Sequence, residues 1–402
     1  MRGVTLNRLR ASNLTERGLL GLTAAFLITS VTMVSQAAAP YEALNGASAF
    51  TFVARDLAYV AVGLVGFFMA LRMPMRTLRL TAVPLLGLSL LLLAYVYLKG
   101  HAQYGGQRWI SFGGLTIQPS EIYKLTGGLF LATFLPRARA LHRGLLPEYA
   151  ISAFVMLGVL LILIEPDLGT AAIVGLMTFM ALALNGMASR ALTWTAGTLG
   201  VLAVASLLSS SYQRERVLSF LHLSHKAGAS DQATQAKIAI GSGGLFGLGS
   251  GHSRAIWGAL PNAHTDFIFA VVGEEFGLIG TIFVLGLFLL LVIFGMRAAA
   301  SCKDPTSGIL AGCITLWFGA EAVINLASVT GAFPVTGVPL PFLSYGGSAL
   351  IVDLFAMGLL VNIARHQGIR HAEQSRLDRM PALAFTRPSI FPGPSTSRSL
   401  HR

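Results

Sequence analysis

Charged residues are scarce in this sequence: Asp, Glu, Lys and Arg make up 11% of 402 residues, whereas hydrophobic residues make up 54%. Roughly a quarter of a soluble domain is charged, so this composition excludes an ordinary soluble chain and indicates one that crosses a membrane repeatedly. Acidic residues are scarcer than basic ones, with 17 Asp and Glu against 29 Lys and Arg. Each carboxylate in an apolar segment therefore needs an explanation.

Two further absences narrow the function. Only two cysteines occur, Cys302 and Cys313, and we expect one in a cytoplasmic loop and the other in a span, so no disulfide framework is indicated. The pattern G-x-x-x-x-G-K-[ST] does not occur, and the run GSGGLFGLGSG lacks the Lys that would reach a phosphate. We therefore interpret these glycines as allowing tight turns and close backbone approach, in preference to a phosphate cradle.

Long apolar runs predict transmembrane helices, because a bilayer core of roughly 30 Å needs about 20 apolar residues per helical span. The predicted fold class is an all-α polytopic membrane protein with ten spans and a large extracytoplasmic loop before the eighth. Pro166 separates the fifth and sixth spans, which we expect to form a hairpin with almost no loop. The spans are expected near residues 18–39, 56–73, 80–98, 120–136, 147–165, 167–186, 191–209, 266–295, 308–331 and 347–365.

The distribution of Lys and Arg predicts the orientation. Most basic residues fall on the cytoplasmic side if both termini are cytoplasmic, as the positive-inside rule requires. We interpret the net charge of +12 as topology and attraction to anionic lipid, and we expect no nucleic acid partner. A cytoplasmic arm (1–17) precedes the membrane domain (18–366), and a basic tail (367–402) is expected to be disordered. The extracytoplasmic loops are expected near residues 99–119, 210–265 and 332–346.

The stretch LPNAHTDFIFAVVGEEFGLIG places carboxylates at the start of the eighth span. Asp266 either caps this helix, by accepting hydrogen bonds from its first free N–H groups, or is a functional carboxylate near the outer membrane surface. Glu274 and Glu275 lie about 12–13 Å deeper, at about 1.5 Å per residue, too far from Asp266 for the close carboxylate pair of a glycosidase. We interpret them as buried polar groups that hold neighbouring spans.

Basic residues of the outer loops share the predicted side of Asp266. They are Arg108, Arg214, Arg216, Lys237 and Arg254. Glu121 and Lys124 lie three residues apart just inside the fourth span, so a local ion pair is the simplest interpretation. A buried ion pair also marks a polar cavity within a bundle.

Three long motifs follow one another in the chain: GGQRWISFGGLTIQPSEIYKL (105–125), GSGGLFGLGSGHSRAIWGALPNAHTDFIFAVVGEEFGLIG (241–280) and PVTGVPLPFLSYGGSALI (334–351). They resemble the SEDS family, the RodA/FtsW peptidoglycan polymerases, and the resemblance extends over about residues 18–366. It implies a ten-helix bundle that polymerises lipid II on the outer face of the cytoplasmic (inner) membrane and releases undecaprenyl pyrophosphate. The second motif is nearer to the division (FtsW) type than to the elongation type.

The resemblance implies a catalytic role for Asp266, the Asp of the HTDF motif. As a lone base for the acceptor sugar's hydroxyl it suits a donor that is already activated by pyrophosphate, and one direct displacement inverts the anomeric centre. We expect Arg108, Lys124, Lys237 and Arg254 to stabilise the leaving pyrophosphate. These are substrate-binding candidates.

Further substrate-binding candidates come from the same resemblance. Glu121 occupies a motif position, and Asp167 of EPDLGT either lines the outer cavity or caps a helix. Prolines 334, 339 and 341 break the last motif, which we expect to be a re-entrant lid around the site. Ser344 and Tyr345 of this lid are possible substrate contacts, although packing is the simpler interpretation.

The resemblance also implies a divalent cation, Mg or Mn, with unknown ligands, and no organic cofactor. The expected partners are undecaprenyl-linked glycan, a class B penicillin-binding protein that crosslinks the strand, and divisome or elongasome membrane proteins. Two departures from the family pattern, Glu321 and Asp353, are buried carboxylates expected to pair with Arg or Lys or to be protonated. Two alternatives stay open: a lipid II flippase, and a non-catalytic scaffold of the division or elongation machinery.

Overall fold

The computed structural model shows a bundle of long helices. It describes residues 2–44, 49–103, 106–112, 115–141, 146–187, 189–221, 229–258, 260–345 and 347–377. In these segments the long helices are α1 (Arg2–Leu44), α2 (Ala49–Arg72), α3 (Met75–Lys99), α4 (Pro119–Leu141), α5 (Leu146–Ile164), α6 (Leu168–Leu184), α7 (Ser189–Ser209), α10 (Ile268–Ser301), α11 (Pro305–Thr330) and α12 (Gly347–Leu377). Each predicted span corresponds to one of them, so the predicted fold class is confirmed.

The exterior of the bundle is apolar, as a membrane requires. In the described segments, eight of the long helices are long and apolar enough to cross a bilayer, and α6 is a shorter apolar helix. The tenth, α4, carries Glu121 and Lys124. Exposed Leu side chains lie along the helices, with Leu80 of α3 at 71% and Leu91 at 70% exposure, and such surface is stable only against lipid. The protein is a multi-pass membrane protein.

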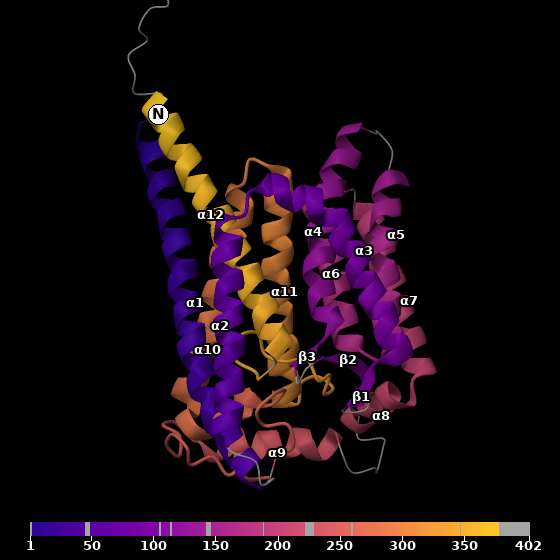
Figure 1. The fold of residues 1–402 in the computed structure, drawn as a ribbon, viewed down its shortest axis with the longest axis vertical. Coiled ribbons are helices and arrows are strands. Elements are labelled where there is room, and N and C mark those ends of the chain that lie inside the picture. The colour runs from indigo at the N-terminus through magenta and orange to yellow at the C-terminus, as the bar shows by residue number, and fades with distance from the viewer. Residues whose placement is uncertain are drawn as a thin grey trace, which may run out of the picture.

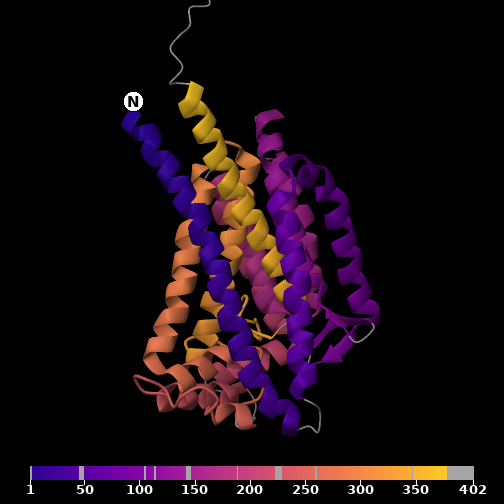
Figure 2. The same cartoon turned by 60° about the vertical axis from the view of Figure 1, so that its left-hand side comes forward.

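The two ends of the bundle carry different structures. The start of α1 and the end of α12 lie at one end, which we call the terminal end (Figures 1 and 2). The strands, α8 (Ser211–Phe220) and α9 (Ala229–Ser242) lie at the other end. Both termini lie at the same end because an even number of spans returns the chain to the side on which it began. Helix α12 continues to Leu377, beyond the predicted span; residues 378–402 of the predicted tail lie outside the described residues.

Regular structure occurs in two segments that we predicted only as loops. Residues 101–117 form an antiparallel sheet of β1 (His101–Gln103), β2 (Gly106–Phe112) and β3 (Leu115–Ile117), with Ile110 opposite Ile117. Residues 210–265 contain α8 (Ser211–Phe220), α9 (Ala229–Ser242) and the short 3-10 helix η1 (Ala255–Trp257). Strands of three residues are too short to show a periodic pattern in the sequence.

Glycines bring a loop directly against the backbone of α10. This helix is broken at Gly277, whose φ of 63° departs from helical geometry. The residue 243–249 loop fills the break: Leu248 N donates to Glu274 O (2.9 Å), and Leu278 N donates to Gly244 O (2.9 Å). A Cβ on Gly243 would lie 1.9 Å from the carbonyl oxygen of Gly273. The predicted role of these glycines in close backbone approach is confirmed.

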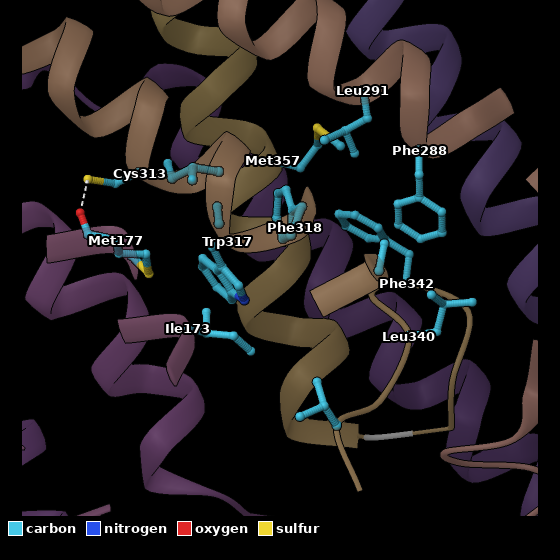
Figure 3. Close-up of a cluster of buried hydrophobic side chains, with 14 of the residues drawn as sticks. Ile173, Met177, Phe288, Leu291, Cys313, Trp317, Phe318, Leu340, Phe342 and Met357 are labelled. Atoms are coloured by element: carbon cyan, nitrogen blue, oxygen red, sulfur yellow. Dashed lines mark hydrogen bonds between the residues drawn. The ribbon is translucent and has the colours of Figure 1, made fainter. Parts of the chain in front are cut away.

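Residues 332–345 form a re-entrant segment between α11 and α12. Phe342 packs against Phe26 of α1, with ring centroids 5.0 Å apart. It also packs against Phe318 of α11, at 4.8 Å (Figure 3). Phe318 lies twelve residues before the end of α11, which is about 18 Å along a helix. The segment therefore dips into the bundle, as the prolines of the sequence predict.

Candidate active site

Asp266 lies immediately before α10, at the end of the bundle opposite the termini. Phe267 occupies the N-cap position, and no side chain of the described residues caps the helix there. The structure therefore assigns Asp266 no capping role. Asn325 of α11 donates from Nδ2 to the backbone oxygens of Asp266 and Val338, both at 2.8 Å. This amide holds Asp266 in place and leaves its carboxylate available for other contacts.

Two arginines and one carboxylate set the electrostatic environment of Asp266. Burial raises the pKa of its carboxyl to about 6; Arg216 and Arg108 act in the opposite direction, and the negative charge of Asp167 adds to the rise. Burial lowers the pKa of His264 to about 4, so this neighbouring imidazole is neutral near pH 7. Asp266 is therefore ionised at pH 7 and accepts a proton readily.

Arg108 is held by the turn between α5 and α6. Its Nε donates to Glu165 O at 3.2 Å, its Nη2 donates to Pro166 O, and its Nη1 lies 3.8 Å from Asp167 Oδ2. Asp167 also caps α6, because its Oδ1 accepts from Thr170 N at 3.1 Å. The capping interpretation of Asp167 is confirmed, and its role in lining the outer cavity stays a prediction. Burial raises the pKa of Glu165 to about 9, so this neighbouring carboxyl is protonated near pH 7.

Arg216 of α8 links the re-entrant segment to Asp266. Its Nη1 donates to Val335 O at 2.9 Å. A Cβ on Gly337, which has a φ of 74°, would lie 3.5 Å from both Arg216 Nη1 and Asp266 Oδ2. Only glycine keeps this space open without backbone strain. Our sequence interpretation placed Arg216 on the same side as Asp266, which the structure bears out, but did not select it as a site residue.

Lys237 of α9 lies beside Arg216, across a small cavity. The two basic residues, together with Val335 and Gly331, line a volume of about 50 Å³. Ligand sites for drug-sized molecules measure roughly 300–1,000 Å³. The cavity between Arg216 and Lys237 is therefore smaller than such a ligand site.

Glu121 and Lys124 belong to a separate, buried cluster. Lys124 Nζ lies 2.7 Å from Glu121 Oε2 and also bonds Glu321 Oε1, and it lies 4.7 Å from the Trp317 ring centroid. The predicted ion pair is present, and Glu321 pairs with Lys as one of its two predicted alternatives. Lys124 has no exposed surface, so any role in binding pyrophosphate requires this cluster to open.

The two remaining candidate residues, Arg254 and Ser344, make contacts within the outer loop and the re-entrant segment. Arg254 is exposed at the start of η1, and its backbone N donates to Glu274 Oε1 at 3.1 Å. Glu274 Oε2 accepts from Ala255 N at 3.1 Å, so this glutamate holds the outer loop against α10. Ser344 Oγ accepts from Leu340 N at 2.8 Å within the re-entrant segment. That contact agrees with packing, the simpler of the two interpretations.

The side chains around Asp266 do not form a binding site for a resident cation. Among the described residues, no three His, Cys, Asp or Glu side chains gather where they could hold a metal. Arg108 and Arg216 supply positive charge beside Asp266. A divalent cation stays a prediction, and we assign no reaction step to it.

The fold and this site define a class: a multi-pass membrane protein with an arginine-flanked carboxylate at one end of its bundle. The chain belongs to the FtsW/RodA/SpoVE family of cell cycle proteins, whose family model matches residues 17–369. A probable peptidoglycan glycosyltransferase FtsW of Trichlorobacter lovleyi is 37% identical over 353 residues, which cover 86% of this chain and 92% of that protein. The stage V sporulation protein E of Bacillus subtilis is 34% identical, with 86% and 95% coverage.

Solved structures show the same similarity. A chain of a peptidoglycan synthase complex matches with a TM-score of 0.72 and 31% identity, covering 87% of this chain and 97% of that one. The rod shape determining protein RodA of Thermus thermophilus matches with a TM-score of 0.66 and 30% identity, covering 87% and 96%.

Proposed function

We propose that this chain is an inverting peptidoglycan glycosyltransferase that polymerises lipid II into glycan strands. The observation that carries the proposal is the partly buried Asp266 with Arg216 and Arg108 acting on its charge. The names of the relatives, probable peptidoglycan glycosyltransferase FtsW among them, support the reaction class. We favour the division role over elongation because these relatives carry the FtsW name.

The chemistry follows from these three side chains. The Asp266 carboxylate takes the proton of the acceptor sugar's 4-hydroxyl as its oxygen attacks the anomeric carbon of the undecaprenyl-linked glycan. The bond from this carbon to the pyrophosphate oxygen breaks, and undecaprenyl pyrophosphate leaves with the electron pair. Arg216 and Arg108 stabilise the charge that develops on the pyrophosphate, and Lys237 lies beside the same opening. One displacement inverts the anomeric centre.

Orientation is part of the proposal. We place Asp266 on the outer face of the cytoplasmic (inner) membrane and both termini in the cytoplasm, because arginines concentrate at the terminal end. Alkaline phosphatase, which is active only outside the cytoplasm, should be inactive when fused after Arg402 and active when inserted within residues 222–228. The reverse pattern would refute this orientation.

The site is closed in this structure, and we propose that a partner protein opens it. The cavity beside Arg216 is much smaller than a disaccharide, so the re-entrant segment or α8 and α9 must move for lipid II to bind. We propose that a class B penicillin-binding protein favours the open state within the division machinery. A matching chain comes from a synthase complex that coordinates polymerization and crosslinking, which supports a partner of this kind.

The test is polymerisation of purified lipid II by the full chain with its penicillin-binding partner. Asp266→Asn removes the base but keeps the shape, and we expect the rate to fall about 100-fold or more. Glu215→Gln removes an exposed carboxylate from neighbouring α8 and should polymerise normally. Thermal unfolding of each variant in detergent checks that it is folded.

Each alternative gives a different result. Equal glycan ladders from wild type and a folded Asp266→Asn variant would exclude Asp266 as the base. No ladder from either protein, with a divalent cation present, would favour the flippase or the scaffold.

A further inference from the structure

A second cavity, of about 650 Å³, lies at the terminal end of the bundle, away from Asp266. Its walls come from the start of α3, the end of α4, the start of α11 and the middle of α12. The ionisable side chains that line it are Arg76, Arg79, Arg137, Asp304 and His366. Three arginines against one aspartate give this cavity a net positive charge.

The single carboxylate of the cavity is already engaged. Arg79 Nη2 lies 2.6 Å from Asp304 Oδ1, and Asp304 Oδ2 accepts from Ser307 N at 3.1 Å to cap α11. Within the described residues, no carboxylate lies within ion-pair distance of Arg76 or Arg137. Two positive charges are thus left for an anion.

Two buried polar atoms in the lining have no hydrogen-bond partner among the described residues. Asn362 Nδ2 donates to Ala70 O at 2.7 Å and to Met73 O at 2.8 Å, which fixes the orientation of the amide. Asn362 is 1% exposed, and its Oδ1 is left as a free acceptor. Arg79 Nε is left as a free donor. An occupant that satisfies both offers a hydrogen-bond donor, such as a hydroxyl group, as well as an acceptor, such as an anionic oxygen.

The start of α3 adds to the attraction for an anion. Pro74 is its N-cap residue and, within the described part of the chain, no side chain caps the helix. The free N–H groups and the dipole of a 25-residue helix favour negative charge at this position.

An apolar groove adjoins the cavity. It measures about 580 Å³ and is lined mostly by apolar residues, with Val65, Phe68 and Met69 of α2 on one side and Arg72 and Thr77 also in its walls; Pro74 belongs to the walls of both. A basic cavity that shares a wall with a groove on the lipid-facing surface suits an anionic lipid better than a soluble anion.

We propose that this cavity binds the headgroup of an anionic glycerophospholipid of the phosphatidylglycerol type. The phosphodiester lies between Arg76, Arg137 and the start of α3, a glycerol hydroxyl donates to Asn362 Oδ1, and an acyl chain follows the groove beside Pro74. The site is separate from Asp266 and does not depend on the proposed reaction.

The test is native mass spectrometry of the delipidated full chain with dioleoyl lipids of different headgroups. Phosphatidylglycerol should bind about tenfold more tightly than zwitterionic phosphatidylcholine. Phosphatidylmethanol, which keeps the charge but lacks the glycerol hydroxyls, should bind between the two. The double variant Arg76→Gln/Arg137→Gln should lose the preference for phosphatidylglycerol.

A matched control is the double variant Arg17→Gln/Arg297→Gln, which removes the same charge from exposed residues of the terminal end outside this cavity. It should keep the preference. Equal preference in both double variants would overturn the proposal. So would displacement of phosphatidylglycerol by soluble glycerol 1-phosphate at equal concentration, which would indicate a free-anion site, or by a lower concentration of undecaprenyl pyrophosphate.

Discussion

At the scale of single residues, the proposed reaction depends on how Asp266 is held. Asn325 bonds its backbone, Gly337 leaves space beside its carboxylate, and Arg216 and Arg108 act on its charge from α8 and β2. Burial and positive charge oppose each other here, so the pKa of Asp266 is raised only to about 6. The carboxylate is a stronger base than an exposed aspartate and is still ionised near neutral pH.

The pH profile of polymerisation tests how far burial and the two arginines together shift the pKa of Asp266. Because Asp266 must be ionised to accept a proton, the rate should be constant above its pKa of about 6 and fall as the pH decreases through that value, about tenfold per pH unit. Initial rates of lipid II polymerisation between about pH 5 and pH 8 measure it. A rate that stays constant down to pH 5 would contradict the raised pKa.

At the scale of elements, the break in α10 depends on contact between two backbones. The residue 243–249 loop supplies donors and acceptors to the turn around Gly277, where the helix cannot bond itself. This loop continues towards η1, whose first turn is bonded to the carboxylate of Glu274. The glycines therefore position the outer loops that precede Asp266.

Two glycine-to-alanine substitutions distinguish the contact between the 243–249 loop and α10 from the general effect of replacing a glycine. In Gly243→Ala the new methyl group would lie 1.9 Å from Gly273 O, so we expect a loss of about 2–3 kcal/mol of stability. In Gly241→Ala the Cβ meets nothing within 4 Å, and the variant should be as stable as wild type or more so. Thermal unfolding in detergent compares them; equal melting temperatures would show that the loop does not pack as described.

At the scale of the whole molecule, buried charges join three helices. Lys124 of α4 bonds Glu321 of α11, and Asp353 of α12 accepts from Phe342 N at 3.3 Å in the re-entrant segment. Buried charges are costly unless paired, so this cluster favours one arrangement of α4, α11 and α12.

Removing the one cation of this cluster should be severe. Lys124→Met leaves Glu121, Glu321 and Asp353 buried without a counter-ion, at a cost of about 3–5 kcal/mol. Glu321→Gln keeps an acceptor for Lys124 and should cost less. Yield of folded protein and melting temperature in detergent measure both, and a Lys124→Met variant as stable as wild type would refute the structural role of the cluster.

Much of the site could be identified from sequence because motifs are local. HTDF contains Asp266, EPDLGT contains Asp167, and the arginine of GGQRW is Arg108. Arg216 could not be selected in this way, since SYQRERVLSF contains two arginines and nothing local distinguishes Arg216 from Arg214. Only the fold of α8 against the re-entrant segment brings Arg216 to Val335 O.

The sequence by itself determined the membrane class, the ten spans and the Pro166 hairpin, because the length and polarity of each apolar run depend only on neighbouring residues. Tertiary structure alone decided that Arg216, Arg108 and Asp167 influence Asp266, and that Glu121 and Lys124 lie in a separate buried cluster. Those positions depend on how helices far apart in the chain pack together, and the energy of burying charge selects among the possible pairings.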